Sequence, residues 1–390
     1  MKQIIDSERR PIKLWLDDIE ATALAQARNL ANHPFTFSHV AIMPDAHAGY
    51  GMPIGGVLAC DGAVICNAVG VDIGCGMCAE QTSLSSLDRE TLKKILGLVR
   101  TAVPVGFDHH KQQQERSLLP DLARLDQVEK SIVREQFQAG CKQIGTLGGG
   151  NHFIEIQQGD DGHVWLMIHS GSRNLGLKVA EYYNRLAGRL NEEWGSLVPK
   201  QWQLAYLPLE TQEAQDYLAE MHWCVDFALA SRKLMMERLK EAVQEVVGEV
   251  AFLHSINKAH NYAAMEEHFG KEVLIHRKGA TRARAGEYGI IPGSQGSRSF
   301  IVLGKGNAES YASCSHGAGR RMGRGQAQRE LDLAAEVERL NAMGVVHAVR
   351  NQKDLDEAPG SYKDIESVMA NQTDLVEIAV SLLPLAVIKG

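Results

Sequence analysis

Residues 53–77, PIGGVLACDGAVICNAVGVDIGCGM, decide the fold class. Short runs of Val, Ile, Leu and Ala are interrupted by Gly, which is typical of buried β-strands joined by tight turns. The preceding residues 39–49, HVAIMPDAHAG, have the same character. We therefore expect strands and turns over most of roughly the first 80 residues.

Helical periodicity appears further along the chain. Apolar residues recur every three or four positions in residues 86–102, 177–195, 210–247 and about 326–342, and a last helix precedes the tail LLPLAVIKG. Strand and turn chemistry returns at 250–310. Strands and helices are thus mixed without regular βαβ alternation, and no linker or repeat interrupts them. We predict an α+β fold, a single large domain over residues 1–390 with mixed or antiparallel sheets flanked by helices.

The composition excludes several classes of protein. No apolar run approaches the roughly 18 residues that cross a membrane, and the N-terminal residues lack the features of a signal peptide. Seven scattered cysteines form no disulfide framework, so we expect a cytoplasmic protein. The net charge of −7 argues against nucleic-acid binding over the whole surface.

One segment has a different charge balance. Residues 276–325 contain nine Lys and Arg, seven of them Arg, but only two acidic residues, together with eleven Gly. Forked guanidinium groups suit phosphate oxygens, and Gly-rich loops such as IPGSQGSRSF, VLGKGN and SHGAGR expose backbone N–H groups. None of these loops matches a P-loop or a dinucleotide fingerprint. We predict that the protein binds a phosphate-bearing ligand, but not through a P-loop or a dinucleotide-binding fold.

A first candidate metal site lies in VGVDIGCGMC, residues 69–78. Cys75 and Cys78 form a CxxC pair, but the chain has no second CxxC to complete a zinc knuckle. Asp72 and Cys75 together offer a carboxylate and a thiolate, which suit a borderline divalent metal. The spacing alone leaves two interpretations open, a metal site and buried structural cysteines.

Three histidines follow glycine-rich or strand segments. His152 comes after the glycines of GTLGGGNHFIEI, His169 ends the apolar run of MIHSGSRNLG, and His260 lies in NKAHNYA. A single histidine is more often a core or surface residue than a ligand. Three in similar settings favour a mononuclear or dinuclear site for Mn²⁺ or Zn²⁺.

Taken together, these segments resemble the RtcB family of GTP-dependent RNA ligases. The matching motifs occur in order along the chain: MPDAHAGYGMPIGG, VGVDIGCGM, GTLGGGNHFIEI, HSGSR, AHNYA, RKGATRARAG, IPGSQGSRSF, SHGAGR and the terminal VIKG. The resemblance implies an enzyme that joins RNA ending in a 3′-phosphate or 2′,3′-cyclic phosphate to RNA with a 5′-hydroxyl. GTP would be the co-substrate, with two Mn²⁺ in each active site.

The resemblance also assigns roles to residues. His316 in SHGAGR would attack GTP, carry GMP and pass it to the RNA 3′-phosphate. Cys75 would bridge the two ions. His152 and His169 would bind one ion, and Asp72 and His260 the other.

Further contacts are carried over in the same way. The residues matched to guanosine and phosphate contacts are Asn151, Phe153, Glu155, Pro292, Gly293, Ser294, Gln295, Ser299, Gly317, Ala318, Gly319, Tyr362 and Lys389. Gln295 departs from the pattern, since many members have Met there. Arg173 and Arg320 are expected on RNA or triphosphate oxygens, and Asp45 is a candidate for orienting the RNA 5′-hydroxyl end.

Two other function classes are weighed against ligation. A metal-dependent 2′,3′-cyclic phosphodiesterase or phosphatase could use the same metals without joining RNA, but it would leave His316, Arg320 and Lys389 without a task. A non-catalytic RNA-binding module would be net basic with aromatic platforms, whereas this chain is acidic with 6% aromatic residues. The RNA, from transfer RNA or ribosomal RNA, and the need for an activating or release-factor-like partner stay open.

Overall fold

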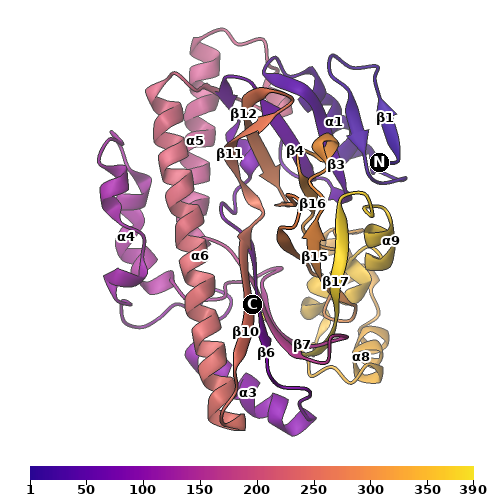
Figure 1. Cartoon of the computed structure of the whole chain (residues 1–390). Helices are drawn as coiled ribbons and strands as arrows, with labels where there is room; N and C mark the ends of the chain where they lie inside the picture. Colours follow the sequence, from indigo (N-terminus) through magenta and orange to yellow (C-terminus); the bar gives the residue numbers. More distant parts are fainter.

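The computed structural model describes residues 1–390 and contains two large sheets (Figure 1). The six-stranded sheet consists, in sheet order, of β1 (Gln3–Ile5), β2 (Ile12–Leu14), β3 (Thr36–His47), β4 (Ile54–Cys60), β12 (Lys271–Lys278) and β11 (Asn261–His268). The seven-stranded sheet consists of β10 (Phe252–Ala259), β6 (Gly76–Thr82), β8 (Val164–Ser170), β7 (Phe153–Gly159), β17 (Val376–Lys389), β15 (Ser299–Gly304) and β14 (Tyr288–Ile291).

Strand pairing is antiparallel within both sheets except between β2 and β3, which run parallel. The α+β class with mixed sheets is therefore confirmed. Two small ribbons complete the strands: β5 (Ala63–Val64) pairs with β9 (Leu207–Pro208), and β13 (Ala280–Arg282) with β16 (Ser313–Ser315). The chain passes from one sheet to the other several times, from β4 to β6 and from β10 to β11 for example, so we infer one domain.

Two long helices lie side by side along the sheets (Figure 1). They are α5 (Arg173–Glu193) and α6 (Gln212–Val247), with α4 (Ile132–Gln143) packed outside α5 and α3 (Arg89–Ala102) against α6. The apolar residues of α6 recur at helical spacing, so one face buries Met221, Phe227 and Met235. The helices expected at 86–102, 177–195 and 210–247 are confirmed. No helix has both the length and the apolar character needed to cross a membrane.

Other helical predictions need correction. Helix α1 (Ala21–Asn32) interrupts the segment expected to form strands and turns, and α4 was not expected. The helix expected at about 326–342 is two helices, α7 (Arg324–Glu330) and α8 (Leu333–Ala342), because the Asp332 side chain accepts a hydrogen bond from the backbone N–H of Ala335 and begins a new helix. The short helices α2 (Cys66–Val69) and α9 (Ile365–Ala370) complete the set, and α9 precedes the tail as expected. Single 3₁₀ turns lie at Arg116–Leu118, Leu122–Leu125, Lys200–Trp202, Ala308–Ser310, Gln352–Glu357 and Pro359–Ser361.

Sheet topology brings four chain segments to one edge of the seven-stranded sheet. Strands β10, β6, β8 and β7 are neighbours and alternate in direction, so β6 and β7 begin at the edge where β8 and β10 end. Gly76 at the start of β6 pairs with Ala259 and with Ser170, at the ends of β10 and β8. Gly76 must be glycine, since a Cβ there would lie 2.1 Å from the carbonyl oxygen of Lys258. The residues just beyond these strand ends therefore meet.

Candidate active site

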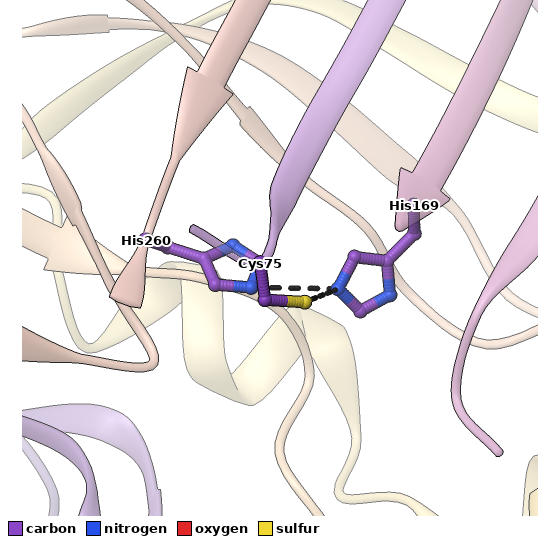
Figure 2. A group of neighbouring side chains, drawn as sticks. All are labelled: Cys75, His169 and His260. Atoms are coloured by element: carbon purple, nitrogen blue, oxygen red, sulfur yellow. Dashed lines mark hydrogen bonds between the residues drawn. The ribbon is translucent and has the colours of Figure 1, made fainter. Parts of the chain in front are cut away.

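Cys75, His169 and His260 meet at this edge, each from a different strand end (Figure 2). The Sγ of Cys75 lies 3.2 Å from Nε2 of His169, and that nitrogen lies 3.4 Å from Nε2 of His260. The backbone carbonyl of Asn151 accepts a hydrogen bond from Nδ1 of His169 at 3.1 Å. This bond leaves the lone pair of Nε2 pointing at the sulfur and the second imidazole.

A second group shares the same cysteine. The Nε2 of His152 lies 3.1 Å from Oδ2 of Asp72 and 3.5 Å from Sγ of Cys75. Cys75 thus belongs to both groups, as expected of a bridging ligand. Without ions, His152 lies nearest to Asp72 and His169 nearest to His260. How the four residues divide between two ions stays a prediction.

The donor set fits divalent metal ions. Burial, followed by the charges of neighbouring histidines, lowers the pKa of His169 and of His260 well below the usual value, so both imidazoles are neutral. Burial raises the pKa of the Cys75 thiol well above its usual value, so a thiolate there requires a nearby cation. In each group the donor atoms lie within 4.8 Å of one another: sulfur and two nitrogens in the first, and sulfur, nitrogen and a carboxylate oxygen in the second. Imidazole, thiolate and carboxylate together suit a borderline metal better than a hard one.

A buried arginine from α6 holds the metal-ligand segments together. Arg232 donates to the backbone carbonyls of Gly74 at 2.9 Å and Ser170 at 2.8 Å, and its Nε donates to the side chain of Asn257 at 2.8 Å. Gly74 precedes Cys75, Ser170 follows His169, and Asn257 lies three residues before His260. Sequence reasoning missed Arg232, because one arginine in a helical pattern looks like a surface residue until the helix is packed.

Arg173 lies next to His152. Its Nη1 lies 2.9 Å from Nδ1 of His152 and donates to the carbonyl of Leu147 at 2.8 Å. The side chain lines the cleft described below, but this nitrogen is already engaged. Arg173 therefore lies against the outer side of His152, and its contact with RNA or triphosphate oxygens stays a prediction.

His316 lies beside the ligand cluster with its ring fixed. The ring centroids of His316 and His260 are 4.7 Å apart. Nδ1 of His316 donates to Oδ2 of the fully buried Asp45 on β3 at 2.6 Å, which leaves Nε2 with a free lone pair. Gly279 (φ +59°) lies under the ring, where a Cβ would be 3.0 Å from Cε1 of His316. The structure thus places Asp45 behind the histidine, and its role in orienting the RNA 5′-hydroxyl end stays a prediction.

The loop that contains the glycines next to His316 is held against β3. The backbone N–H groups of His316 and Gly317 donate to Oδ2 of Asp45 at 3.1 and 3.3 Å. Contact of this loop with a phosphate stays a prediction. Gly319 (φ +73°) lies against β3, where a Cβ would be 2.0 Å from the carbonyl oxygen of Asp45. These glycines therefore permit the close approach of the loop to β3.

One cleft of about 1460 Å³ unites the predicted site. Its walls include all five candidate metal ligands, His316, Arg173, Arg320 and every residue matched to a guanosine or phosphate contact except Ser299. Ser299 is buried behind the wall, and its hydroxyl accepts hydrogen bonds from the N–H of Gly293 at 3.1 Å and the side chain of Gln157 at 3.1 Å. Ser299 shapes the loop that lines the cleft, and direct contact with a ligand stays a prediction.

Comparison with known proteins gives a consistent result. A family model described as tRNA-splicing ligase RtcB matches residues 26–390. The chain is 39% identical over 413 residues to the RNA-splicing ligase RtcB of Escherichia coli (strain K12), covering 100% of this chain and 99% of that protein. The chain belongs to the RtcB family. It is also 31% identical over 461 residues to the tRNA-splicing ligase RtcB of Thermococcus kodakarensis, covering 98% of this chain and 95% of that protein.

A buried glutamate organises the wall opposite the metal ligands. Glu357 lies 3.1 Å from Nη1 of Arg320 and accepts a hydrogen bond from Nε of Arg324 at 2.8 Å. The Tyr362 hydroxyl donates to the same carboxylate. Burial opposes ionisation of Glu357, but the charges of Lys389, Arg320 and Arg324 outweigh it and lower the pKa. Arg320 was expected on RNA or triphosphate oxygens, and the structure shows that it also holds this carboxylate.

Glu155 and Lys389 face the cleft from adjacent strands. Burial raises the pKa of Glu155 to about 7, although the charge of Lys389 and a hydrogen bond from Gln157 oppose the rise. Burial also lowers the pKa of Lys389, whose Nζ lies 5.5 Å from the centroid of the Phe153 ring. The cleft therefore contains a carboxyl group that changes charge near neutral pH and can receive N–H donors of a ligand once it is ionised.

The basic segment 276–325 is only partly available to a ligand. Arg277 is fully buried and forms an ion pair with Glu266, and Arg282 pairs with Glu287. Lys278 does line the cleft, where burial lowers its pKa to about 7, and it donates to the carbonyls of Tyr50 at 2.6 Å and Asn67 at 3.0 Å. A count of Lys and Arg in the sequence could not separate the buried structural arginines from the cations that face the cleft, because both kinds contribute equally to the count.

Proposed function

We propose that this protein is an RNA ligase that joins a 3′-phosphate or 2′,3′-cyclic phosphate end to a 5′-hydroxyl end, with GTP and Mn²⁺ and through a His316–GMP intermediate. Membership of the RtcB family supports the class of reaction. The observation that carries the proposal is His316, which presents a free Nε2 beside five converging metal ligands while Asp45 holds Nδ1.

In the first step, Nε2 of His316 attacks the α-phosphorus of GTP. A P–N bond forms, the bond from the α-phosphorus to the bridging oxygen breaks, and pyrophosphate leaves. The ring gains positive charge as the bond forms, and the adjacent Asp45 carboxylate offsets it. Two Mn²⁺ held by the five ligands would neutralise charge on the phosphate oxygens.

In the second step, an oxygen of the RNA 3′-phosphate attacks the phosphorus of the bound GMP. The P–N bond breaks and neutral His316 is regenerated. The 5′-hydroxyl oxygen of the second RNA then attacks the activated 3′-phosphorus, its proton passes to solvent, and GMP leaves as the phosphodiester forms. A cyclic phosphate is first opened by water to a 3′-phosphate. The last reaction requires chiefly that the two RNA ends be aligned.

Transfer-RNA halves are the first substrates to test, since relatives such as that of Thermococcus kodakarensis are named tRNA-splicing ligases. Nicked ribosomal RNA is the alternative substrate. We also propose a cytoplasmic location, because all seven cysteines are buried and free of disulfides, as in proteins of a reducing compartment.

The test has two stages. The protein is incubated with Mn²⁺ and GTP labelled at the α-phosphate, and acid-labile label on the protein is measured for the wild type and His316→Ala. RNA pairs ending in a 3′-phosphate, a cyclic phosphate or a 3′-hydroxyl are then incubated with and without GTP. We expect labelled wild-type protein, unlabelled variant, and GTP-dependent joining of the first two kinds of end only.

The rival phosphodiesterase predicts a different pattern. It would open or remove the terminal phosphate without GTP, would join no RNA, and would leave the protein unlabelled. An RNA-binding module would bind the RNA without changing its ends, and His316→Ala would have no effect. Either pattern would overturn the proposal.

A further inference from the structure

Two aromatic side chains of the cleft wall face solvent. Phe107 is 100% exposed and Tyr50 is 68% exposed, which makes them the two most exposed aromatic residues of the chain. Both line the cleft that contains His316, together with Val71, which is 41% exposed. Scattered exposed apolar residues need no explanation, but the two most exposed rings on one functional cleft are a different observation.

The backbone under Phe107 is held in place. The N–H of Asp108 donates to the carbonyl of Val105 at 3.1 Å, which closes a turn with Phe107 inside it. The N–H of Gly106 donates to the carbonyl of Gly148 at 2.9 Å, and Val105 pairs with Gly148. This turn is therefore attached to the glycine loop that precedes His152, and it presents an exposed ring on the cleft.

The backbone of Tyr50 is held from both sides. Its carbonyl accepts a hydrogen bond from Nζ of Lys278 at 2.6 Å. The side chain of Gln26 accepts a hydrogen bond from the N–H of the preceding Gly49 at 3.1 Å and donates to its carbonyl at 2.5 Å. Both rings are thus mounted on fixed backbone, which limits the entropy lost when a flat partner packs on them.

The charges of the cleft indicate the kind of partner. The cleft that the two rings line is also lined by Arg173, Lys278, Arg321 and Arg324, although some nitrogens of these side chains are engaged with protein groups. Proteins that hold single-stranded nucleic acid combine cations along the backbone path with aromatic rings on which bases stack. Both elements are present here, although the chain as a whole carries a net charge of −7.

We propose that Phe107 and Tyr50 are stacking platforms for unpaired bases next to the RNA ends that enter the cleft. This inference rests on the proposed ligase function and adds a substrate requirement to it: the RNA ends must be single-stranded, with at least one base free to stack. The rings accept any base, because every base has a π face. A duplex end whose last base pairs are intact presents no free face and is a poor substrate.

The experiment compares the wild type with Phe107→Ala and Tyr50→Ala. Joining is measured with short RNAs that have 3′-phosphate and 5′-hydroxyl ends, either complete or with one nucleotide near the junction made abasic in turn. Protein labelling by GTP without RNA is measured in parallel. We expect each alanine variant to raise the KM for complete RNA by about 5- to 150-fold and to keep wild-type labelling. When the abasic position is the one that faces a given ring, the KM of the wild type should rise by the same factor. The KM of the variant that lacks this ring should not rise further, because the stacking contact is already absent.

Three variants separate stacking from other effects. Tyr50→Phe keeps the ring and is expected to retain the wild-type KM. Phe107→Leu keeps an apolar side chain without a flat face, so its KM is expected to rise almost as much as that of Phe107→Ala. Leu197→Ala, at a 97% exposed position outside the cleft, is the matched control and leaves KM unchanged.

The outcomes are distinguishable from failure of the ligase proposal. A wild type that neither becomes labelled nor joins RNA overturns the proposed function. Two results with a wild type that joins RNA would overturn the stacking inference alone. One is an unchanged KM in both alanine variants. The other is that the KM increases from the alanine variant and from the abasic site combine additively in free energy at every abasic position.

Discussion

Replacement of Asp45 tests whether this carboxylate orients the nucleophile. Its Oδ2 accepts three hydrogen bonds, from Nδ1 of His316 at 2.6 Å and from the backbone N–H groups of His316 and Gly317. Asp45→Asn is nearly isosteric and can keep an oxygen in this position, but it removes the negative charge. Asp45→Ala removes the acceptor, and the proton can then move to Nε2 of His316, which cannot attack in that form.

The two variants are expected to differ in magnitude. A hydrogen bond to a charged group contributes about 1.5–3 kcal/mol and a neutral one about 0.5–1.5 kcal/mol, so loss of the charge costs about 1–2 kcal/mol. Asp45→Asn should therefore slow guanylylation by roughly 5- to 30-fold. Asp45→Ala loses the charged hydrogen bond and leaves buried donors unpaired, so the cost is about 3–4 kcal/mol and the rate falls by roughly 10²–10³-fold.

The assay is single-turnover transfer of labelled GMP to the protein with Mn²⁺ and without RNA. Thermal unfolding of each variant confirms that it is folded, and Asp61→Asn, at an exposed surface aspartate, is the matched control. Guanylylation by Asp45→Ala within about threefold of the wild type would refute the orienting role. Normal guanylylation with impaired joining would instead return Asp45 to the RNA 5′-hydroxyl end.

Three other perturbations have defined outcomes. Cys75 belongs to both ligand groups and His260 to only one. Elemental analysis of desalted protein should therefore find about two Mn²⁺ in the wild type, about one in His260→Ala and almost none in Cys75→Ala. Equal loss of Mn²⁺ in both variants would contradict a shared sulfur ligand. Because burial raises the pKa of Glu155 to about 7 and only the ionised carboxylate accepts two N–H donors, affinity for a fluorescent GTP analogue should fall as the pH drops below about 7. Glu155→Gln should lack this dependence, and persistence of the same pH profile in the variant would assign it to another group. Finally, Glu266→Ala leaves the buried Arg277 unpaired and should lower the free energy of unfolding by about 3–5 kcal/mol in denaturant titration. Burial opposes ionisation of Glu266, but hydrogen bonds from His268 and Arg277 lower its pKa from 4.5 to about 2. The wild type should therefore lose this stability as the pH falls from about 4.5 toward 2. An equal loss of stability in acid in Glu266→Ala would contradict the assignment to Glu266.

Local sequence determined much of the secondary structure. Apolar periodicity identified α3, α5 and α6, and the Gly-interrupted runs identified the strands around β4 and β6, because each pattern reports which face of an element is buried. It missed α1, which is a short Ala-rich helix, and it predicted one helix where the capping side chain of Asp332 separates α7 from α8. Neither feature produces a long periodic signal.

The sequence by itself also supplied the chemical groups: a carboxylate, a thiolate and four histidines in motifs whose order resembles one family. Only the tertiary structure decided how they are arranged. Asp72 and His152 lie side by side, and so do His169 and His260, because antiparallel strand order fixes which chain ends are neighbours. Periodicity along one strand carries no information about its register with another. The same reason applies to Asp45, which reaches the side chain of His316 across 271 residues of sequence.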